Sequence, residues 1–398
     1  MKRFFFTTIA LAAVAIGCTK SGLIESPQTY EDPITFETYT GKAPVTKATE
    51  AKNETLQSSG FQVVGYLEQP NGTTIDVSKK PYLYRTVNYS SGKWGYDNAA
   101  YWPQGEELTF VAYGLNGAAA FDENTTDYSK LPYTVPAAIG DQKDLVIGKV
   151  IQNHDKSKGI VAVDFHHVLS RVGFKVITSG STAVNATIKN ITISGNFVTG
   201  GTFDLTNAVY DDSNNATAYT APSDKTYGKI NSTTATATTY SLFDSDYNAT
   251  TDYTNINEVN DYACFVATGN STQDIYANNS FNPKSNPRTD FTDPTNSSQT
   301  NKDNRFLMIM PQYTVTPAST EGGDPTISGI DVDIRVIYQL TDAEEQVADF
   351  ELTDFTFMPG KAYEIVFTIS TVSVGFNVDV QGWDTTHDKA STTITPAA

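Results

Sequence analysis

Three residues near the start of the chain point to chemistry: Cys18 through its thiol, and Lys42 and Lys47 as basic residues in a segment that a protease could cut. Cys18 follows Ala15-Ile16-Gly17, and small residues directly before a cysteine resemble the lipobox of bacterial lipoproteins. The resemblance implies cleavage before Cys18 and acylation of its sulfur, for example with palmitate. A simple secretory signal with a chance cysteine is the alternative, but the order of the features favours lipidation.

The residues before this cysteine form a signal peptide. Lys2 and Arg3 supply positive charge, and residues 4–16 form an apolar run that is too short to span a bilayer. We therefore expect residues 1–18 to be a lipoprotein signal peptide. Each buried CH2 of an acyl chain contributes about 0.8 kcal/mol, so a multiply acylated Cys18 would hold the chain on a membrane.

The two lysines follow a predicted strand. Ile34 and Phe36 fall on one face of residues 34–39, and polar or aromatic residues alternate with them. The basic, proline-bearing segment behind this strand, residues 41–48, is a place where a protease could cut. If the strand left its sheet, it would leave an apolar groove that binds another strand.

Other candidate chemistry finds no supporting pattern. His166 and His167 are adjacent, so on a strand they point to opposite faces and cannot both bind one metal ion. Asp331 and Asp333 lack the spacing of a calcium-binding loop. The sequence contains no phosphate-binding loop or nucleophile elbow. We therefore predict no metal, no cofactor and no enzymatic activity; a glycosidase with paired carboxylates stays an open alternative that no residue pair favours.

Two further residues that chemistry could use stand alone. Cys264 has no partner for a disulfide if Cys18 is acylated, so we expect it to be a buried apolar residue in a strand. His154 has no neighbour in a recognisable motif, and we expect it to be solvated.

Composition limits the possible functions. The 398 residues carry 27 Lys and Arg against 45 Asp and Glu, a net charge of -18, which disfavours nucleic acid as a partner. The 22 Tyr and 21 Phe, together with abundant Ser, Thr, Asn and Asp, favour strands and turns. The length suggests two domains.

Strand patterns recur along the chain and no stretch shows sustained helical periodicity. This is typical of an all-β protein built of β-sandwiches. A polar linker at residues 178–182 suggests a division into a propeptide with the removable strand (19–47), an N-terminal domain (48–180) and a C-terminal domain (181–398). The predicted strands include residues 61–66, 82–89, 108–113, 161–165, 171–176, 306–310, 330–340 and 363–369.

Several motifs together resemble the fimbrillin-like family, the type V pilus subunits of Gram-negative gut and oral anaerobes. They occur in family order behind the lipobox-like cysteine. The segments are Tyr101-Trp102-Pro103 with residues 108–113, residues 163–174, Gly201-Thr202-Phe203, Met310-Pro311-Gln312, and residues 358–363 with 378–383.

This resemblance implies two tandem transthyretin-like β-sandwich domains and export to the outer membrane as a lipid-anchored precursor. It also implies cleavage after a Lys or Arg by a processing protease, for which Lys47, before Ala48, fits best and Lys42 less well. A C-terminal strand of the next pilin subunit would then fill the groove, and the mature protein would stand in a cell-surface fimbria.

The tail after Trp383 is short, so its role as a donor strand stays open. A stalk subunit, a tip adhesin and an anchor are all compatible with the sequence. The alternative function is therefore a tip adhesin or glycan-binding surface lipoprotein that donates no strand. The sequence does not identify a receptor on a host or bacterial surface.

Overall fold

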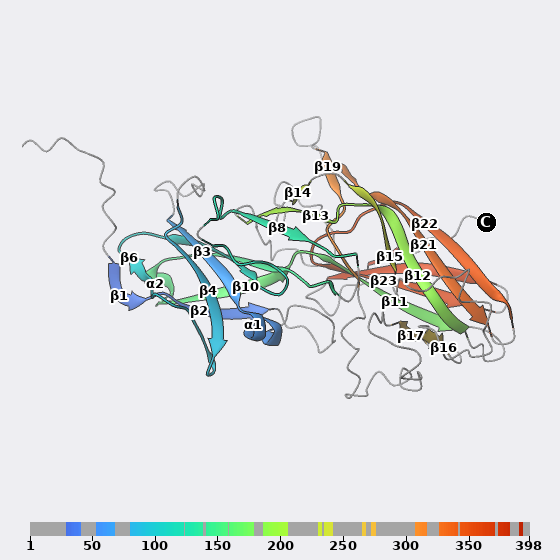
Figure 1. Ribbon diagram of the computed structural model, residues 1–398, viewed down its shortest axis with the longest axis horizontal. Helices are drawn as coiled ribbons and strands as arrows, with labels where there is room; N and C mark the ends of the chain where they lie inside the picture. Colours follow the sequence, from blue (N-terminus) through green and yellow to red (C-terminus); the bar gives the residue numbers. More distant parts are fainter. Residues whose placement is uncertain are drawn as a thin grey trace, which may run out of the picture.

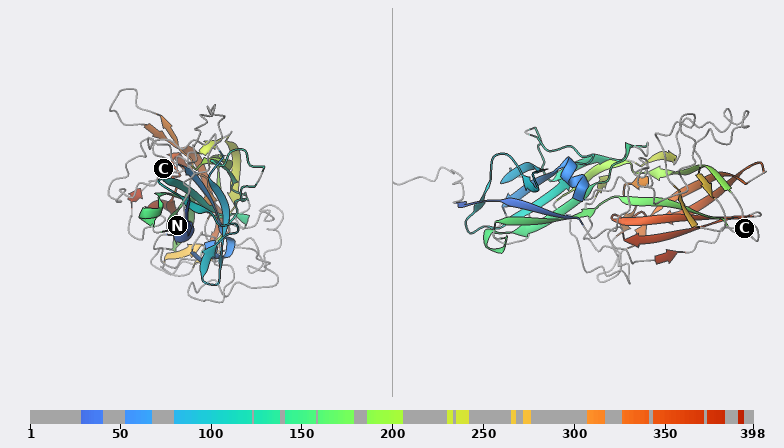
Figure 2. Two further views of the ribbon diagram at one scale, coloured as in Figure 1. Left: turned by 90° about the vertical axis from the view of Figure 1, so that its left-hand side faces the viewer. Right: turned by 90° about the horizontal axis from the view of Figure 1, so that it is seen from below.

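The computed structural model is built almost entirely of strands, with two short helices, α1 (Asn53–Ser59) and α2 (His154–Ser157), in the part that it describes. Most strands before residue 168 lie at one end of the elongated arrangement, and the strands of residues 170–197 lie at the other end with those of the last quarter, as Figures 1 and 2 show. The described residues are 29–40, 53–67, 80–122, 124–137, 141–157, 159–178, 186–205, 230–232, 235–241, 265–267, 272–275, 307–316, 326–340, 343–370, 373–382 and 390–392.

A seven-stranded sheet is built from strands between residues 35 and 167, and it organises the part of the molecule that is named the first half. Its order is β2 (Thr35–Thr40), β10 (Ile160–His167), β9 (Val146–Gln152), β7 (Leu108–Gly114), β3 (Phe61–Leu67), β4 (Leu83–Ser90) and β5 (Lys93–Gly95). Only the β2–β10 pairing within this sheet is parallel. Before β2, the strand β1 (Thr29–Pro33) pairs antiparallel with β6 (Tyr101–Pro103).

Both faces of this sheet are buried, because consecutive side chains of its central strands enter different cores. Val63 and Phe110 belong to one hydrophobic cluster, whereas Val64 and Val111 belong to another. The first cluster also contains Ile34 from the N-terminal segment. Such strands are continuous apolar runs, which is why the sequence shows them so clearly.

Two further sheets, built from strands between residues 170 and 392, face each other and share one core. They form the part of the molecule that is named the second half. In one sheet β17 (Thr272–Ile275), β11 (Ser170–Thr178), β23 (Lys361–Ile369), β24 (Val374–Gly382) and β25 (Ala390–Thr392) follow in order, and β18 (Leu307–Ile309) also pairs with β11. In the other, β15 (Thr236–Ser241), β12 (Ala186–Phe197), β21 (Ile330–Leu340) and β22 (Glu345–Phe355) follow in order, and β16 (Phe265–Ala267) also pairs with β12. The prediction of an all-β, sandwich-type fold is confirmed.

Two smaller sheets complete the described strands. One contains β14 (Ile230–Ser232), β13 (Gly200–Asp204) and β8 (Lys130–Thr134), and the other contains β19 (Thr314–Thr316) and β20 (Thr326–Ser328). The second buried cluster collects Tyr113 and Leu145 together with Phe203 and Met308. It therefore joins early strands to residues from much later in the chain.

The Met310-Pro311-Gln312 motif supplies polar contacts close to this second cluster, which contains Met310. The Gln312 side chain accepts from the Val198 backbone N–H at 2.9 Å and donates to the Val198 and Met310 carbonyls at 2.8 and 2.7 Å. Gln312 is buried, so these bonds satisfy a polar group that would otherwise be costly to bury. The glutamine of the Met-Pro-Gln motif thus has a structural role.

Several local predictions are confirmed. Residues 330–340 form β21, whose side chains alternate between buried and exposed, and β12 contains the expected irregularity between Ile188 and Asn190. The strand β11 ends at Thr178 and pairs with β23, so its sheet is shared with residues of the last quarter. The division into two domains at residue 180 stays a prediction, and Cys264 lies outside the described residues.

Candidate functional site

The removable strand predicted around Ile34 and Phe36 is paired in the structure. It forms β2, at the edge of the seven-stranded sheet (Figure 1). Its register on β10 runs from Thr35 opposite Ile160 to Thr40 opposite Phe165. The segment ahead of the predicted cut is therefore part of a sheet.

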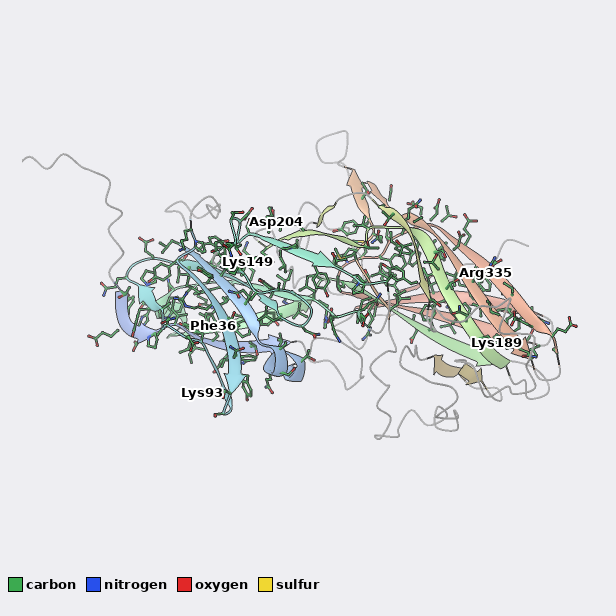
Figure 3. All side chains as sticks on the ribbon, in the orientation of Figure 1. Phe36, Lys93, Lys149, Lys189, Asp204 and Arg335 are labelled. Carbon is green, nitrogen blue, oxygen red and sulfur yellow. The ribbon has the colours of Figure 1, made fainter. Side chains whose placement is uncertain are left out.

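The two apolar side chains of this segment fill the core of the first half. Ile34 is 1% exposed and Phe36 is 4% exposed. The Phe36 ring centroid lies 5.8 Å from that of Phe110 and 6.1 Å from that of Phe61, both nearly perpendicular to it. Figure 3 places Phe36 among the strands of the N-terminal end. Edge-to-face contacts of this kind add to the stability that burial of the ring provides.

Backbone hydrogen bonds fix the segment on both sides of these side chains. The Ile34 N–H donates to the Ala100 carbonyl at 2.8 Å, and the Tyr96 hydroxyl donates to the Ile34 carbonyl at 2.6 Å. Both the N–H and the hydroxyl of Thr35 donate to the Gly159 carbonyl at 3.0 Å. Burial, the largest cause, raises the pKa of Tyr96, so this hydroxyl keeps its proton and remains a donor at neutral pH.

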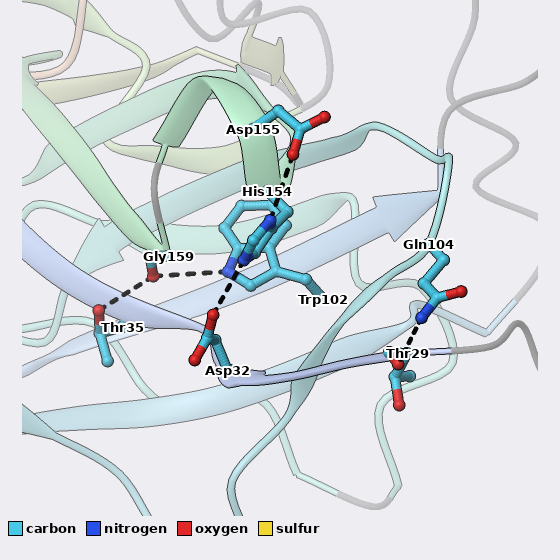
Figure 4. A network of polar contacts seen from close by, with 8 residues as sticks. All are labelled: Thr29, Asp32, Thr35, Trp102, Gln104, His154, Asp155 and Gly159. Carbon is cyan, nitrogen blue, oxygen red and sulfur yellow. Dashed lines mark hydrogen bonds and ion pairs between the residues drawn. The ribbon is translucent and has the colours of Figure 1, made fainter.

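A second group of contacts holds β1, and it centres on His154 (Figure 4). The imidazole stacks on the Tyr30 ring, with centroids 3.9 Å apart and planes at 11°. Its Nε2 lies 3.2 Å from a carboxylate oxygen of Asp32, and Gln104 donates to the Thr29 carbonyl at 3.1 Å. The expectation that His154 is solvated is wrong, because its side chain is only 20% exposed. Nothing in the local sequence indicates these contacts, because Tyr30 and Asp32 lie more than a hundred positions away from His154.

Other predicted site residues lie outside this region. Cys18, Lys47, Lys42 and Ala48 fall outside the described residues. Their roles in lipidation and cleavage therefore stay predictions.

The remaining candidate residues make structural contacts. His167 is buried and its Nδ1 lies 2.5 Å from Asp144, while the less buried His166 lies 3.4 Å from Asp164. Asp331 accepts a hydrogen bond from the Asp354 backbone N–H at 2.9 Å, so it orders a strand end. In the described part of the chain, no group of three or more His, Cys, Asp or Glu side chains could hold a metal ion. No helix within the described ranges has the length and apolar character needed to cross a membrane.

Comparison with known proteins places this geometry in context. A fimbrial protein from Bacteroides vulgatus has a similar fold, with a TM-score of 0.53 and 16% identity over 88% of this chain and 99% of that one. A candidate cell adhesion protein from Bacteroides uniformis aligns with a TM-score of 0.43 and 16% identity, over 88% of this chain and 99% of that one. A fimbrial assembly protein from Parabacteroides distasonis aligns with a TM-score of 0.39 and 9% identity, over 93% and 100% of the two chains.

No curated protein matches the sequence. The sequence model of the fimbrillin-like family matches residues 46–383, which is most of the chain and begins next to the predicted cleavage position. The strands β1 and β2 therefore precede the matched region, while their pairing partners β6 and β10 lie within it. On this match, the chain belongs to the fimbrillin-like family.

Proposed function

We propose that this protein is a structural subunit of a cell-surface fimbria that polymerises by strand exchange after losing its N-terminal segment. In this proposal the chain is exported as a lipoprotein acylated at Cys18 and held at the outer membrane. A protease then cuts after Lys47, and the segment that contains β2 leaves. The partners are neighbouring pilin subunits, and the lipid anchor belongs to the precursor.

The observation that carries this proposal is the placement of Ile34 and Phe36. Full burial contributes about 1.5–3 kcal/mol for each such side chain, and β2 adds a strand ladder to the edge of β10. A cut after Lys47 would separate this segment from the core it completes. The groove left behind would expose Phe61 and Phe110 and the hydrogen-bonding edge of β10, which another strand would cover favourably.

The main test removes the cut. The double variant Lys47→Ala with Lys42→Ala should keep its N-terminal segment and stay monomeric on the cell. Electrophoresis under mild denaturation would detect the polymer ladder, and N-terminal sequencing would locate the cut. An exposed lysine elsewhere, changed in Lys93→Ala, serves as the control and should process normally. Normal polymers from the double variant would contradict the proposal.

A second test concerns the donor. In the structure β25 pairs with β24, and β24 contributes Phe376 and Val378 to the core of the second half. Deletion of residues 384–398 leaves β24 intact, whereas a deletion from residue 372 would remove core side chains. Loss of polymer without loss of folding would assign donation to the tail; full polymerisation would exclude the tail as donor.

A further inference from the structure

The N-terminal segment is held at two places that differ in chemistry. Phe36 enters an apolar core, whereas Tyr30 and Asp32 of β1 contact His154 at the start of α2. Tyr30 stacks on one face of the imidazole at 3.9 Å, and Asp32 accepts at its Nε2 at 3.2 Å. One side chain of the protein body thus contacts an aromatic residue and an acidic residue that stand two positions apart.

Other contacts of His154 come from residues that follow the predicted cut after Lys47, which together are called the body of the protein. The Trp102 ring lies edge-on to the imidazole at 6.4 Å and 71°, is fully buried, and donates from Nε1 to the Gly159 carbonyl at 3.4 Å. Asp155 lies 3.4 Å from Nδ1 of the same imidazole and is well exposed. Trp102 and Asp155 keep the ring in place from two directions, and Figure 4 shows both beside it.

Cleavage after Lys47 would remove Tyr30 and Asp32 and leave Trp102, His154 and Asp155. The imidazole would then lose its stacking contact with Tyr30 and the Asp32 carboxylate at its Nε2. An incoming segment that covers the same path would regain the stacking only with a planar side chain at the position of Tyr30. It would regain the polar contact only with an acceptor two residues later, because alternate residues of a strand share a face.

We propose that His154 is a specificity-determining residue for strand exchange, an inference that rests on the proposed function. The matching segment carries an aromatic residue, an acidic residue two positions later, and apolar residues four and six positions later. These are the positions of Tyr30, Asp32, Ile34 and Phe36. In the tail of this chain after Trp383, His387 is the one aromatic residue and Lys389 stands two positions on. The occupant of the His154 site is therefore a segment of another subunit, with the stated spacing, and not the tail of a second copy.

The test uses the full chain with a specific protease site in place of residues 41–46, so that a cut leaves the segment bound without a covalent link. A fluorescent peptide of residues 29–40 reports binding after the bound segment has exchanged. Against this peptide, Tyr30→Ala should bind about tenfold more weakly and Asp32→Asn about threefold more weakly. A peptide of residues 384–398 should bind more weakly than either.

Variants of the protein separate a specific role from loss of structure. In His154→Ala protein the unchanged peptide should bind about 30-fold more weakly, the product of the two peptide effects, and the Tyr30→Ala and Asp32→Asn changes should no longer matter. His154→Gln, which keeps a polar side chain, guards against misfolding, and Lys93→Ala is the matched surface control. Thermal unfolding of each uncut variant shows whether the body is intact.

The outcomes distinguish the two proposals. Equal binding of the unchanged, Tyr30→Ala and Asp32→Asn peptides, with loss of binding for Phe36→Ala, would overturn the role of His154 and leave strand exchange standing. Tight binding of the 384–398 peptide would also overturn the spacing rule. Failure of every peptide, including the unchanged one, would overturn strand exchange at this groove and the inference with it.

Discussion

Two strands of the described chain pair in parallel with a later strand: β2 with β10 and β11 with β23. Each is associated with a buried branched aliphatic residue and a buried phenylalanine two positions on. For the first strand these are Ile34, directly before β2, and Phe36; for the second they are Val172 and Phe174. The two halves therefore use similar side chains and the same pairing direction to begin a core.

What differs is the environment of each strand. Among the described strands, β2 has a neighbour on one side, whereas β11 has β23 on one side and β17 and β18 on the other. The chain also passes from β10 to β11 within two residues, so no cut before residue 160 can release β11. Connectivity and pairing, and not side-chain chemistry, therefore distinguish the strand that a cut could release from the one that it could not.

The largest effect is expected in the second half. Phe174 stacks on Phe367 with centroids 6.4 Å apart and planes at 2°. Phe174→Ala should lower the free energy of unfolding by about 3–5 kcal/mol, because the loss leaves a cavity in the core that the two facing sheets share. Urea unfolding measures this change, with the exposed Thr368→Ala as control. A loss below about 1 kcal/mol would show that β11 is no more fixed than β2.

The corresponding change in the first half should act on retention of the segment. In the cut chain, Phe36→Ala should weaken binding of the segment about 100-fold, which corresponds to a loss of about 3 kcal/mol. Size-exclusion chromatography of the cut protein measures how much segment stays bound. Glu37→Ala, next to it and exposed, should change little. If both variants retain the segment equally, burial of Phe36 does not hold β2.

A smaller effect is expected at Tyr96, which donates to the Ile34 carbonyl. Tyr96→Phe should weaken segment binding about fivefold, the value of a typical hydrogen bond. Burial raises the pKa of Tyr96 above 10, and release of the segment would expose the ring, so the bound state holds the proton more tightly. Binding should therefore stay constant below pH 10 and weaken as pH rises above it.

The control for this prediction is the phenylalanine variant itself. A pH titration of segment binding should be flatter for Tyr96→Phe than for the unchanged protein. An equal decline in both would assign the alkaline loss to other groups, such as Tyr82, whose pKa burial also raises.

The sequence did not predict every strand. The charged strand β22 was not predicted because Phe350 and Leu352 are its only buried residues, and the 53% exposed Val347 breaks the apolar–polar alternation. The strand β8 was also missed, since Pro132 interrupts its pattern, yet it pairs with β13. Edge strands need fewer apolar residues, so periodicity marks them weakly.

The sequence alone determined the all-β character, the alternation that buries Ile34 and Phe36, and the family motifs, because these depend on local spacing. Tertiary structure decided that Phe36 meets Phe61 and Phe110 and that His154 receives Tyr30 and Asp32. These partners are brought together by strand pairing between distant parts of the chain. Local periodicity contains no information on which strands become neighbours.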